Sequence, residues 1–343
     1  MKAVRLLART VLGVEALAAA EVAEFGVVRR IAPREVWWTC PEPGPHVLGL
    51  RCADDLFLPA AAVSGIGRAR ADLGRLTEAV AALDVAAVVA RRARFGNHDR
   101  PPAVDVSASY LGRRNYNRFD LEDAAGEPLA AALGLPLHRR RHGAPAPPGS
   151  LSWRLTVADD RAVLALRVAA TPLHRRAYRR ASRPGALHPP LAAAMLRLAD
   201  VRPGEVLLDP FCGTGTIPLE AGVAAIGADA DPTAIAAARV NEAARPGGPG
   251  ATWLVADAGR LPLASGSVDV VVTNPPWNRQ VRAAGALATT PDRFWRELAR
   301  VLTPSGRAVL LLPESAPPPT LPITDRRRVS LAGQHPEVIT VRR

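Results

Sequence analysis

The sequence predicts an α/β protein with an open parallel sheet in its C-terminal half and smaller α+β modules before it. Four short apolar runs between residues 206 and 274 each end at or beside a polar side chain, and a Gly-x-Gly turn joins the first run to a helix. In the N-terminal half, predicted strands alternate with helices and a two-stranded hairpin follows. This order suits small α+β modules better than a second doubly wound domain. The 343 residues leave room for two or three domains.

The N-terminal elements are predicted from their apolar patterns and turn residues. A strand is expected within 1–12 and an amphipathic helix over 13–25, which Gly26 ends. Further strands are expected at 36–39, 47–52 and 104–110, and helices at 73–93 and 120–133, the first of them either continuous or broken near Asp84. The ranges 151–157 and 162–168 predict a hairpin across Asp159 and Asp160, after a proline-rich surface loop at 143–149.

The C-terminal half begins with a predicted buried strand at 206–209, which ends in Asp209 and continues into a glycine-containing loop. Gly213 and Gly215 permit a tight turn and a close approach of the backbone to a ligand, before a helix begins. The loop has neither the third glycine of a dinucleotide fingerprint nor the Gly-Lys-Ser/Thr of a phosphate-binding loop. Asp209 is therefore expected to accept a hydrogen bond from a cationic or amino group, which suits an amino-acid-bearing cofactor better than a pyrophosphate.

The next two predicted strands also carry acids near their ends. The run 224–229 ends at Asp229, where α/β nucleotide sites hold a ribose diol, and Asp231 is the alternative for that contact. A helix is predicted at 232–241, followed by a strand at 253–258 that contains Asp257, which could accept the adenine amino group. Each acid alone could be a solvated or capping residue, but three at successive strand ends favour a ligand site.

Asn274-Pro275-Pro276-Trp277 follows the fourth predicted strand, at 268–273. The nitrogen of an exocyclic base amine is a poor nucleophile, because its lone pair is delocalised into the ring. The Asn274 side-chain oxygen and the Pro275 carbonyl could each accept one N–H and leave the lone pair aimed at a methyl donor. Trp277 is expected to stack on the base. A Pro-Pro turn with a buried Trp is the alternative, and the upstream glycine loop favours the catalytic interpretation.

The composition predicts a soluble, cytoplasmic protein without a metal site. Its three cysteines, Cys40, Cys52 and Cys212, lack paired metal spacing, which argues for a reducing compartment without structural disulfides. Charged side chains interrupt the N-terminal apolar run, so we expect no signal peptide, and no run reaches the roughly 18 apolar residues of a membrane span. His138 and His142 have helical metal spacing, but the arginines between them would repel a cation.

The positive charge is concentrated in the N-terminal half. The net charge is +12, and residues 1–185 carry 28 basic and 18 acidic side chains against 16 and 14 in residues 186–343. This excess is expected if a module outside the catalytic half docks a polyanion. The basic clusters at 139–141 and 326–328 are smaller, and for 139–141 a solvated loop is favoured. In the densest run, at 174–183, the predicted nucleic-acid contacts are Arg175, Arg176, Arg179, Arg180 and Arg183.

From residue 186 on, the chain resembles a class I S-adenosylmethionine-dependent methyltransferase with a Rossmann-like fold. Residues 209–216 are similar to the cofactor loop of that family, and 274–277 to the Asn-Pro-Pro-Tyr motif of its amino-group methyltransferases. Trp277 replaces the more frequent Tyr or Phe, which preserves stacking, and Asn278 stands where Gly is frequent. The resemblance implies S-adenosylmethionine as cofactor, with the contacts Asp209, Phe211, Cys212, Gly213, Gly215, Asp229, Ala230, Asp257, Ala258 and Asn274.

The N-terminal half resembles the THUMP-type RNA-binding architecture. The start of such chains is similar to residues 13–26, and the segment before the THUMP fold is similar to residues 50–55. The entry into the methyltransferase domain is similar to residues 182–189. The resemblance divides the chain into a ferredoxin-like subdomain (1–68), a THUMP-type RNA-binding domain (69–170), a basic linker (171–188) and a Rossmann-like methyltransferase domain (189–343). It implies a structured RNA as partner, and we expect a monomer.

The first hypothesis is a guanosine-N2 methyltransferase that acts on tRNA in the acceptor-stem region, with Asn274, Pro275 and Trp277 as catalytic residues. A base inside an RNA helix hides its reactive edge, so the target must be splayed out at a cost of a few kcal/mol. Methylation of 23S rRNA or of adenine N6 is the alternative, because Asn-Pro-Pro-aromatic does not separate these substrates. An RNA-binding or folding factor without turnover is disfavoured by the intact motifs.

Overall fold

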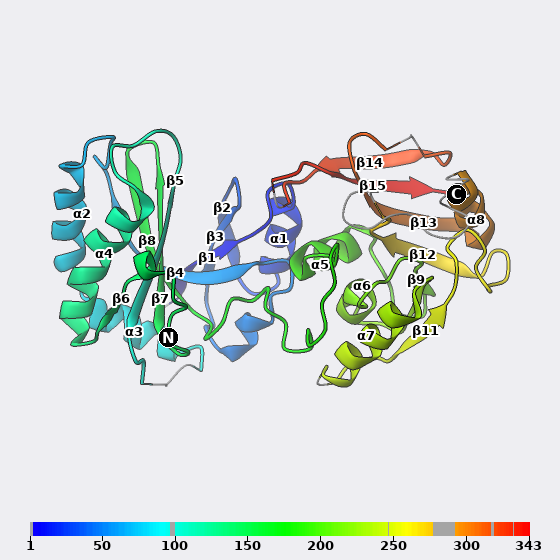
Figure 1. Ribbon diagram of the computed structural model, residues 1–343, viewed down its shortest axis with the longest axis horizontal. Coiled ribbons are helices and arrows are strands. Elements are labelled where there is room, and N and C mark those ends of the chain that lie inside the picture. The colour runs from blue at the N-terminus through cyan, green and yellow to red at the C-terminus, as the bar shows by residue number, and fades with distance from the viewer. Residues whose placement is uncertain (1–2, 97–99, 246, 277–291, 317–318, 332) are drawn as a thin grey trace. The chain divides into compact units, whose positions relative to one another are not determined.

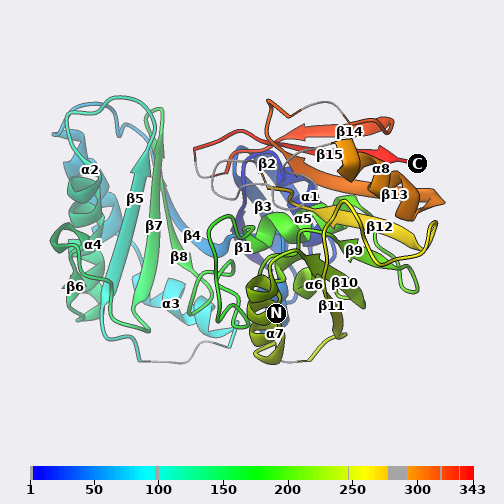
Figure 2. The same ribbon diagram turned by 45° about the vertical axis from the view of Figure 1, so that its right-hand side comes forward.

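The computed structural model describes residues 3–96, 100–245, 247–276, 292–316, 319–331 and 333–343. The chain divides into two compact units. The N-terminal unit comprises Met1–Arg9 and Glu21–Leu173, and the C-terminal unit comprises Thr10–Ala20 and His174–Arg343. Each unit is built on its own sheet, as Figures 1 and 2 show. The mixed α/β class predicted from the sequence is confirmed.

The N-terminal unit contains an eight-stranded sheet of order β2-β3-β1-β4-β8-β7-β5-β6. Its strands are β1 (Val4–Arg9), β2 (Val27–Ala32), β3 (Glu35–Cys40), β4 (Asp55–Val63), β5 (Val104–Tyr110), β6 (Leu137–His138), β7 (Leu151–Ala158) and β8 (Arg161–Arg167). β5 runs parallel to β6 and β7, and the other neighbours are antiparallel. Because β4 pairs with β8, strands from both predicted N-terminal modules lie in one sheet. The domain boundaries at 68/69 and 170/171 stay a prediction.

The helical segments of this half are α1 (Glu15–Val22), which contributes to both units, the 3-10 turns η1 (Pro45–Gly49) and η2 (Arg140–His142), and α2 (Asp72–Ala81), α3 (Val85–Ala93) and α4 (Arg118–Leu133). Two of these helices, α3 and α4, begin with side-chain caps. Asp84 caps α3 by accepting from the Ala87 N–H (2.9 Å), so of the two alternatives for 73–93 the helix broken near Asp84 is the correct one. At the start of α4, Asn117 and Asp120 form a capping box, and the helix ends at Gly134 in the left-handed conformation.

One prediction for the N-terminal half was wrong, and some of the strands there were not predicted. The strand at 104–110 and the hairpin across Asp159 and Asp160 are confirmed. The strand predicted at 47–52 is wrong: Pro45 starts a 3-10 turn that ends at Gly49. The strands β2 and β4 were not predicted, because β2 carries paired arginines without apolar alternation, and β4 contains Pro59 and three alanines, which have low strand propensity.

The C-terminal unit contains a seven-stranded sheet of order β11-β10-β9-β12-β13-β15-β14. The strands are β9 (Leu207–Asp209), β10 (Ala225–Asp229), β11 (Ala251–Val255), β12 (Val268–Thr273), β13 (Leu302–Leu312), β14 (Ile323–Arg328) and β15 (Glu337–Arg342). The first five in spatial order are parallel, and β15 is antiparallel to both of its neighbours. This order confirms the predicted Rossmann-like sheet, and β9 lies in the middle of its five parallel strands.

Helices pack on this sheet through two apolar clusters. The helices are α5 (Pro189–Leu198), α6 (Thr216–Glu220), α7 (Pro232–Ala243) and α8 (Asp292–Val301). Phe294, Trp295 and Leu298 of α8 join the buried residues of β9, β12 and β13 in the larger cluster. Ile235 and Ala238 of α7 pack with Cys212 and Trp253 in the second. These packed helices hold the loops at the strand ends in place.

Candidate active site

The polar side chains singled out in the C-terminal half lie where parallel strands end. β9 ends at Asp209 and β10 at Asp229, Asn274 directly follows β12, and Asp257 lies two residues beyond β11. These strands are neighbours in the parallel part of the sheet, so their carboxyl ends meet at one edge. The fold therefore brings all four side chains to the same edge, which is the place where open α/β sheets bind ligands.

The two glycines of the loop after β9 are required for different structural reasons. Gly215 has φ +83°, and a Cβ there would lie 2.6 Å from Cη2 of Trp253. Gly213 has φ +52°, and a Cβ there would meet no described atom within 4 Å. Gly215 therefore permits close packing of the loop on Trp253, whereas Gly213 leaves open space beside the backbone.

Asp209 ties the loop to the strand that leads to Asn274. It is 2% exposed, and its Oδ1 accepts from the Thr273 hydroxyl (2.7 Å) and from the Phe211 N–H (3.1 Å). Burial raises the pKa of Asp209 to about 7, against the effect of these two hydrogen bonds, and the charge of Asp229 also raises it. The geometry gives Asp209 a bracing role, and its contact with an amino group of a ligand stays a prediction.

Asp229 is tied to the same loop from the neighbouring strand. Its Oδ2 accepts from the Gly213 N–H (3.0 Å) and its Oδ1 from the Asp231 N–H (2.9 Å). The carboxylate is half-buried and each oxygen keeps a further lone pair, so it can still accept from a ribose diol. Ala230 beside it is exposed.

Asp231, the alternative for the ribose contact, is engaged elsewhere. It caps α7 by accepting from the N–H and the hydroxyl of Thr233 (2.8 and 2.7 Å), and Arg183 donates to its Oδ2 at 2.5 Å. The hydrogen bonds from Thr233, and then the one from Arg183, lower the pKa of Asp231 to about 2. Asp229 is therefore the better placed of the two for a ribose.

The remaining predicted cofactor residues have packing roles around the loop. Asp257 accepts from the Gly259 N–H (2.8 Å), and Ala258 is 3% exposed. Phe211 packs edge to face on Phe294, with ring centres 5.2 Å apart. Cys212 is buried, which raises the pKa of its thiol, and its backbone N–H donates to the Ala228 carbonyl (2.9 Å). Contacts between these residues and a cofactor stay predictions.

Asn274 presents a buried acceptor without a donor among the residues that the structure describes. Its Nδ2 donates to the Gly185 carbonyl (3.4 Å), which orients the amide. Its Oδ1 is buried, and among the described residues no group donates to it. A buried acceptor without a donor is costly, so an incoming N–H donor would satisfy it. Pro275 is also described and half-buried, whereas Trp277 and Asn278 lie outside the described residues.

The basic segment at 174–183 is fastened to the cofactor loop and its helices. Arg176 pairs with Glu220 of α6 (2.9 Å), whose carboxylate also accepts from the buried Tyr178 hydroxyl (2.7 Å). Burial, and then the charge of Glu220, raises the pKa of Tyr178. Arg183 is paired with Asp231, and Arg179 donates to Ser182 (3.2 Å).

Four of the five predicted nucleic-acid contacts in this segment separate into two groups, and the fifth, Arg179, is half-buried. Arg176 and Arg183 are occupied by carboxylates of the same unit. Arg175 and Arg180 are exposed, and neither side chain has an ion-pair partner among the described residues. These two remain the better candidates for contacts with a polyanion.

Asn241 of α7 is a site residue that the sequence did not identify. It is 1% exposed, and its Oδ1 accepts from the N–H groups of Arg180 and Ala181 (2.9 and 2.8 Å). Its Nδ2 donates to the carbonyls of Ala181 and Thr214 (3.0 and 2.9 Å). Asn241 therefore joins the basic segment to the cofactor loop. An asparagine inside a helix gives no local sign of this function, because its partners are distant in sequence.

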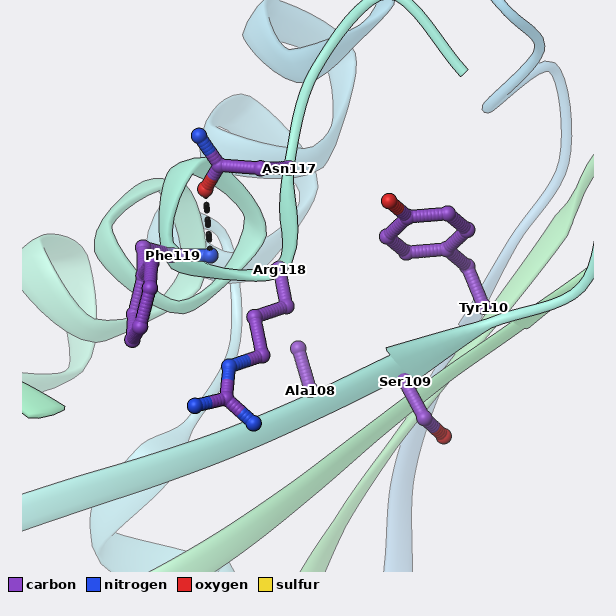
Figure 3. Close-up of a pocket in the computed structure, with 6 residues that line it drawn as sticks. All are labelled: Ala108, Ser109, Tyr110, Asn117, Arg118 and Phe119. Atoms are coloured by element: carbon purple, nitrogen blue, oxygen red, sulfur yellow. Dashed lines mark hydrogen bonds between the residues drawn. The ribbon is translucent and has the colours of Figure 1, made fainter. Parts of the chain in front are cut away.

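A pocket of about 550 Å³ lies in the N-terminal unit, between the end of β5 and the start of α4 (Figure 3). It is lined by Ala108, Ser109, Tyr110, Asn117, Arg118 and Phe119. The guanidinium carbons of Arg118 and Arg141 lie 4.6 and 5.5 Å from the centre of the Phe119 ring. Rings flanked by guanidinium groups are surfaces on which unpaired bases stack.

Two absences hold for the described parts of the chain. No helix there is both long and apolar enough to cross a membrane. No group of three or more His, Cys, Asp or Glu side chains there is arranged to hold a metal ion.

Comparisons with known proteins find related methyltransferases. The methyltransferase domain of the UPF0020 (RMKL-like) family matches residues 176–321. The tRNA (guanine(6)-N2)-methyltransferase of Thermus thermophilus is 32% identical over 312 residues, which cover 87% of this chain and 86% of that protein. The human tRNA (guanine(6)-N(2))-methyltransferase THUMP3 is 34% identical over 176 residues, which cover 46% of this chain and 34% of the human protein.

Two crystal structures match along the whole length. TrmN from Thermus thermophilus superposes with a TM-score of 0.78 at 29% identity, covering 100% of both chains. SMU.472, crystallised in complex with SAH, superposes with a TM-score of 0.72 at 14% identity, covering 100% of this chain and 98% of the other. The second likeness concerns the fold alone.

Proposed function

This chain belongs to the family of the Thermus thermophilus tRNA (guanine(6)-N2)-methyltransferase, and from this premise we propose that it methylates the N2 amino group of a guanosine in tRNA. The names of the bacterial and human relatives specify guanine 6, so we propose the same nucleotide for this protein. The observation that carries the proposal is the buried Asn274 Oδ1 at the edge of the sheet, to which no residue in the described part of the chain donates. The guanine N2 amine would supply that donor.

The substrate amine would be held by two acceptors. Asn274 Oδ1 and the Pro275 carbonyl each take one N2–H, which turns the nitrogen lone pair toward the methyl donor. The Gly185 carbonyl fixes the Asn274 amide from its other side, so the acceptor is aimed before the base arrives. The base stacks on Trp277, and N2 gives up its proton to water after the transfer, so no strong general base is required.

The residues at the sheet edge fit S-adenosylmethionine, which would supply the methyl group. The open space beside Gly213 admits a ligand close to the backbone. Asp229, held by two N–H groups, keeps lone pairs for a ribose diol, and Asp257 is proposed for the adenine amine. Through its hydrogen bonds to Thr273 and Phe211, Asp209 keeps this loop in register with the strand that precedes Asn274.

RNA docking is proposed for the N-terminal unit and the basic segment. We assign it to the predicted ferredoxin-like and THUMP-type modules (1–170) together with Arg175 and Arg180. The supporting observations are the excess of basic residues in 1–185 and the pocket beside Phe119. We further propose that the protein acts as a monomer in the cytoplasm. Its three cysteines are all free and buried, as suits a reducing compartment.

The proposal is tested by nucleoside analysis of RNA after reaction. Unmodified tRNA, a matched tRNA with adenosine at position 6, and 23S rRNA are each incubated with the protein and S-adenosylmethionine. Mass spectrometry should find N2-methylguanosine in the first tRNA alone. N2-methylguanosine or N6-methyladenosine in rRNA would instead select the alternative substrates, and a protein that binds tRNA but leaves every nucleoside unmodified would be an RNA-binding factor.

A further inference from the structure

One face of the strands β5 and β7 carries polar side chains. Figure 1 shows α2 and α4 along the opposite face of these strands. Side chains alternate along a strand, so Trp153 is buried (1% exposed) whereas Arg154 and Thr156 lie on the other side and are partly exposed. The parallel register places Ser107 opposite Arg154 and Ser109 opposite Thr156. The Arg154 guanidinium therefore lies among serine hydroxyls.

Three other arginines beside this face are neutralised by carboxylates. The pairs are Arg9 with Glu35 (3.2 Å), Arg140 with Asp105 (2.7 Å) and Arg167 with Asp55 (2.6 Å). Arg140 holds both oxygens of Asp105, the bidentate arrangement that is favourable for a guanidinium. The protein thus supplies an acid for each of these cations.

Arg154 has hydroxyl partners in place of an acid. Its Nη1 donates to the Ser107 Oγ (3.4 Å) and its Nη2 to the Ser109 Oγ (2.5 Å). Among the described residues, no carboxylate oxygen lies within ion-pair distance of it. Burial, followed by repulsion from Arg9 and Arg140, lowers the pKa of Arg154 to about 10. A cation removed from water without a counter-ion is unfavourable, so an anion bound here would stabilise it.

Glu122, the acid with the largest attraction for Arg154, does not neutralise it. Its Oε1 accepts from the Ala108 N–H (3.0 Å), on the strand between them, and burial raises its own pKa. Its Oε2 is buried without a partner among the described residues. The positive charge on the outer face therefore remains available.

We propose that Arg154, Ser107 and Ser109 form a binding site for a phosphate group. The planar guanidinium fits two phosphate oxygens at once, and the serine hydroxyls can rotate to donate to a third. Arg9, although paired with Glu35, also reaches the Thr156 hydroxyl next to the site through its Nη1 (3.4 Å). The site is distinct from the methyl-transfer residues, which all belong to the C-terminal unit.

The phosphate group can come from an RNA backbone or from inorganic phosphate, and the RNA source rests on the proposed function. The test compares wild type with Arg154→Gln, and with Arg161→Gln as a matched control on β8, since Arg161 is exposed. In the first arm, the melting temperature is followed against inorganic phosphate at constant ionic strength. A ligand of the folded state raises it in a saturating manner.

Wild type and Arg161→Gln should both show this rise, and Arg154→Gln should bind phosphate about tenfold or more weakly, as expected for the loss of charged hydrogen bonds. In the second arm, tRNA binding is measured at several salt concentrations. Arg154→Gln should lower the log–log slope by about 0.7–0.9, the contribution of one phosphate contact. An effect in the first arm alone identifies free phosphate as the ligand, and an effect in the second alone identifies RNA.

A variant with Ser107→Ala and Ser109→Ala keeps the charge of Arg154 and removes the two hydroxyls. It tests the site even if Arg154→Gln does not fold. It should also bind phosphate more weakly. Wild-type behaviour of Arg154→Gln in both arms would overturn the proposal, as would undiminished phosphate and tRNA binding by the serine variant. Methylation is scored separately by nucleoside analysis, so failure of this site and failure of the proposed activity are distinguishable.

Discussion

Alanine substitutions at the two loop glycines should have different effects. In Gly215→Ala the residue must keep φ near +83°, which costs an L-residue about 1–2 kcal/mol. Its Cβ would also lie 2.6 Å from Trp253 and 3.2 Å from the Ala238 Cβ, and such overpacking costs about 1–3 kcal/mol. The expected loss of unfolding free energy is therefore about 2–5 kcal/mol. Gly213→Ala has only the backbone cost of about 1–2 kcal/mol, because its Cβ enters open space.

For cofactor binding, in contrast to stability, Gly213→Ala should have the larger effect of the two variants. The open space beside Gly213 is the proposed position of S-adenosylmethionine, so the added methyl group should weaken its affinity by about tenfold or more, equal to about 1.4 kcal/mol. Urea unfolding gives the stability of both variants, and isothermal titration calorimetry gives the cofactor affinity. If Gly213→Ala binds the cofactor like wild type, the cofactor does not occupy this space. Equal stability of the two variants would contradict the packing of Gly215 on Trp253.

Three further predictions concern charged residues. Asp229→Ala should weaken S-adenosylmethionine binding by about 10- to 100-fold in calorimetry and leave tRNA affinity unchanged; undiminished cofactor affinity would remove its assignment to the ribose. Arg175→Gln combined with Arg180→Gln should lower the salt slope of tRNA binding by about 1.4–1.8, and equal slopes in wild type and the double variant would refute the RNA contact. Arg176→Gln should mainly lower the urea midpoint, because it removes the cation that pairs with the buried Glu220 carboxylate. The pKa of Asp209 is raised to about 7, so the folded protein binds this proton more tightly than the unfolded chain, and the contribution of Asp209 to stability falls as pH rises from about 4 to 7. Asp209→Asn should therefore gain stability relative to wild type over this range. A difference in unfolding free energy between the two proteins that stays constant with pH would contradict the raised pKa.

Much of the C-terminal unit could be predicted because its local and tertiary signals agree. The run at 268–273 is apolar and buried, so it read as a strand with the bounds that β12 has. The acids at strand ends were found for the same reason, since the carboxyl end of each apolar run marks the sheet edge. Asp257 is displaced from this pattern, because β11 ends two residues before it.

What the sequence could not reveal depends on partners that are distant along the chain. Asn241 contacts residues 27 and 60 positions away, and no local pattern identifies them. The basic run at 174–183 gave no means of separating arginines paired with acids from exposed ones, because Glu220 and Asp231 lie 44 and 48 residues from their partners. The role proposed for Arg154 could not be predicted for a related reason: it depends on no carboxylate of the described residues lying within ion-pair distance, which only the folded sheet shows.

The central claim is that Asn274 captures the substrate amine, and single-turnover methylation of unmodified tRNA by Asn274→Ala tests it most directly. Loss of one preorganised hydrogen-bonding group typically slows a reaction by about 10²–10³. The account predicts a rate of N2-methylguanosine formation reduced by this factor, with S-adenosylmethionine and tRNA affinities within a few-fold of wild type. A wild-type rate at saturating cofactor and tRNA would contradict it, because the buried Oδ1 of Asn274 would then have no part in orienting the base.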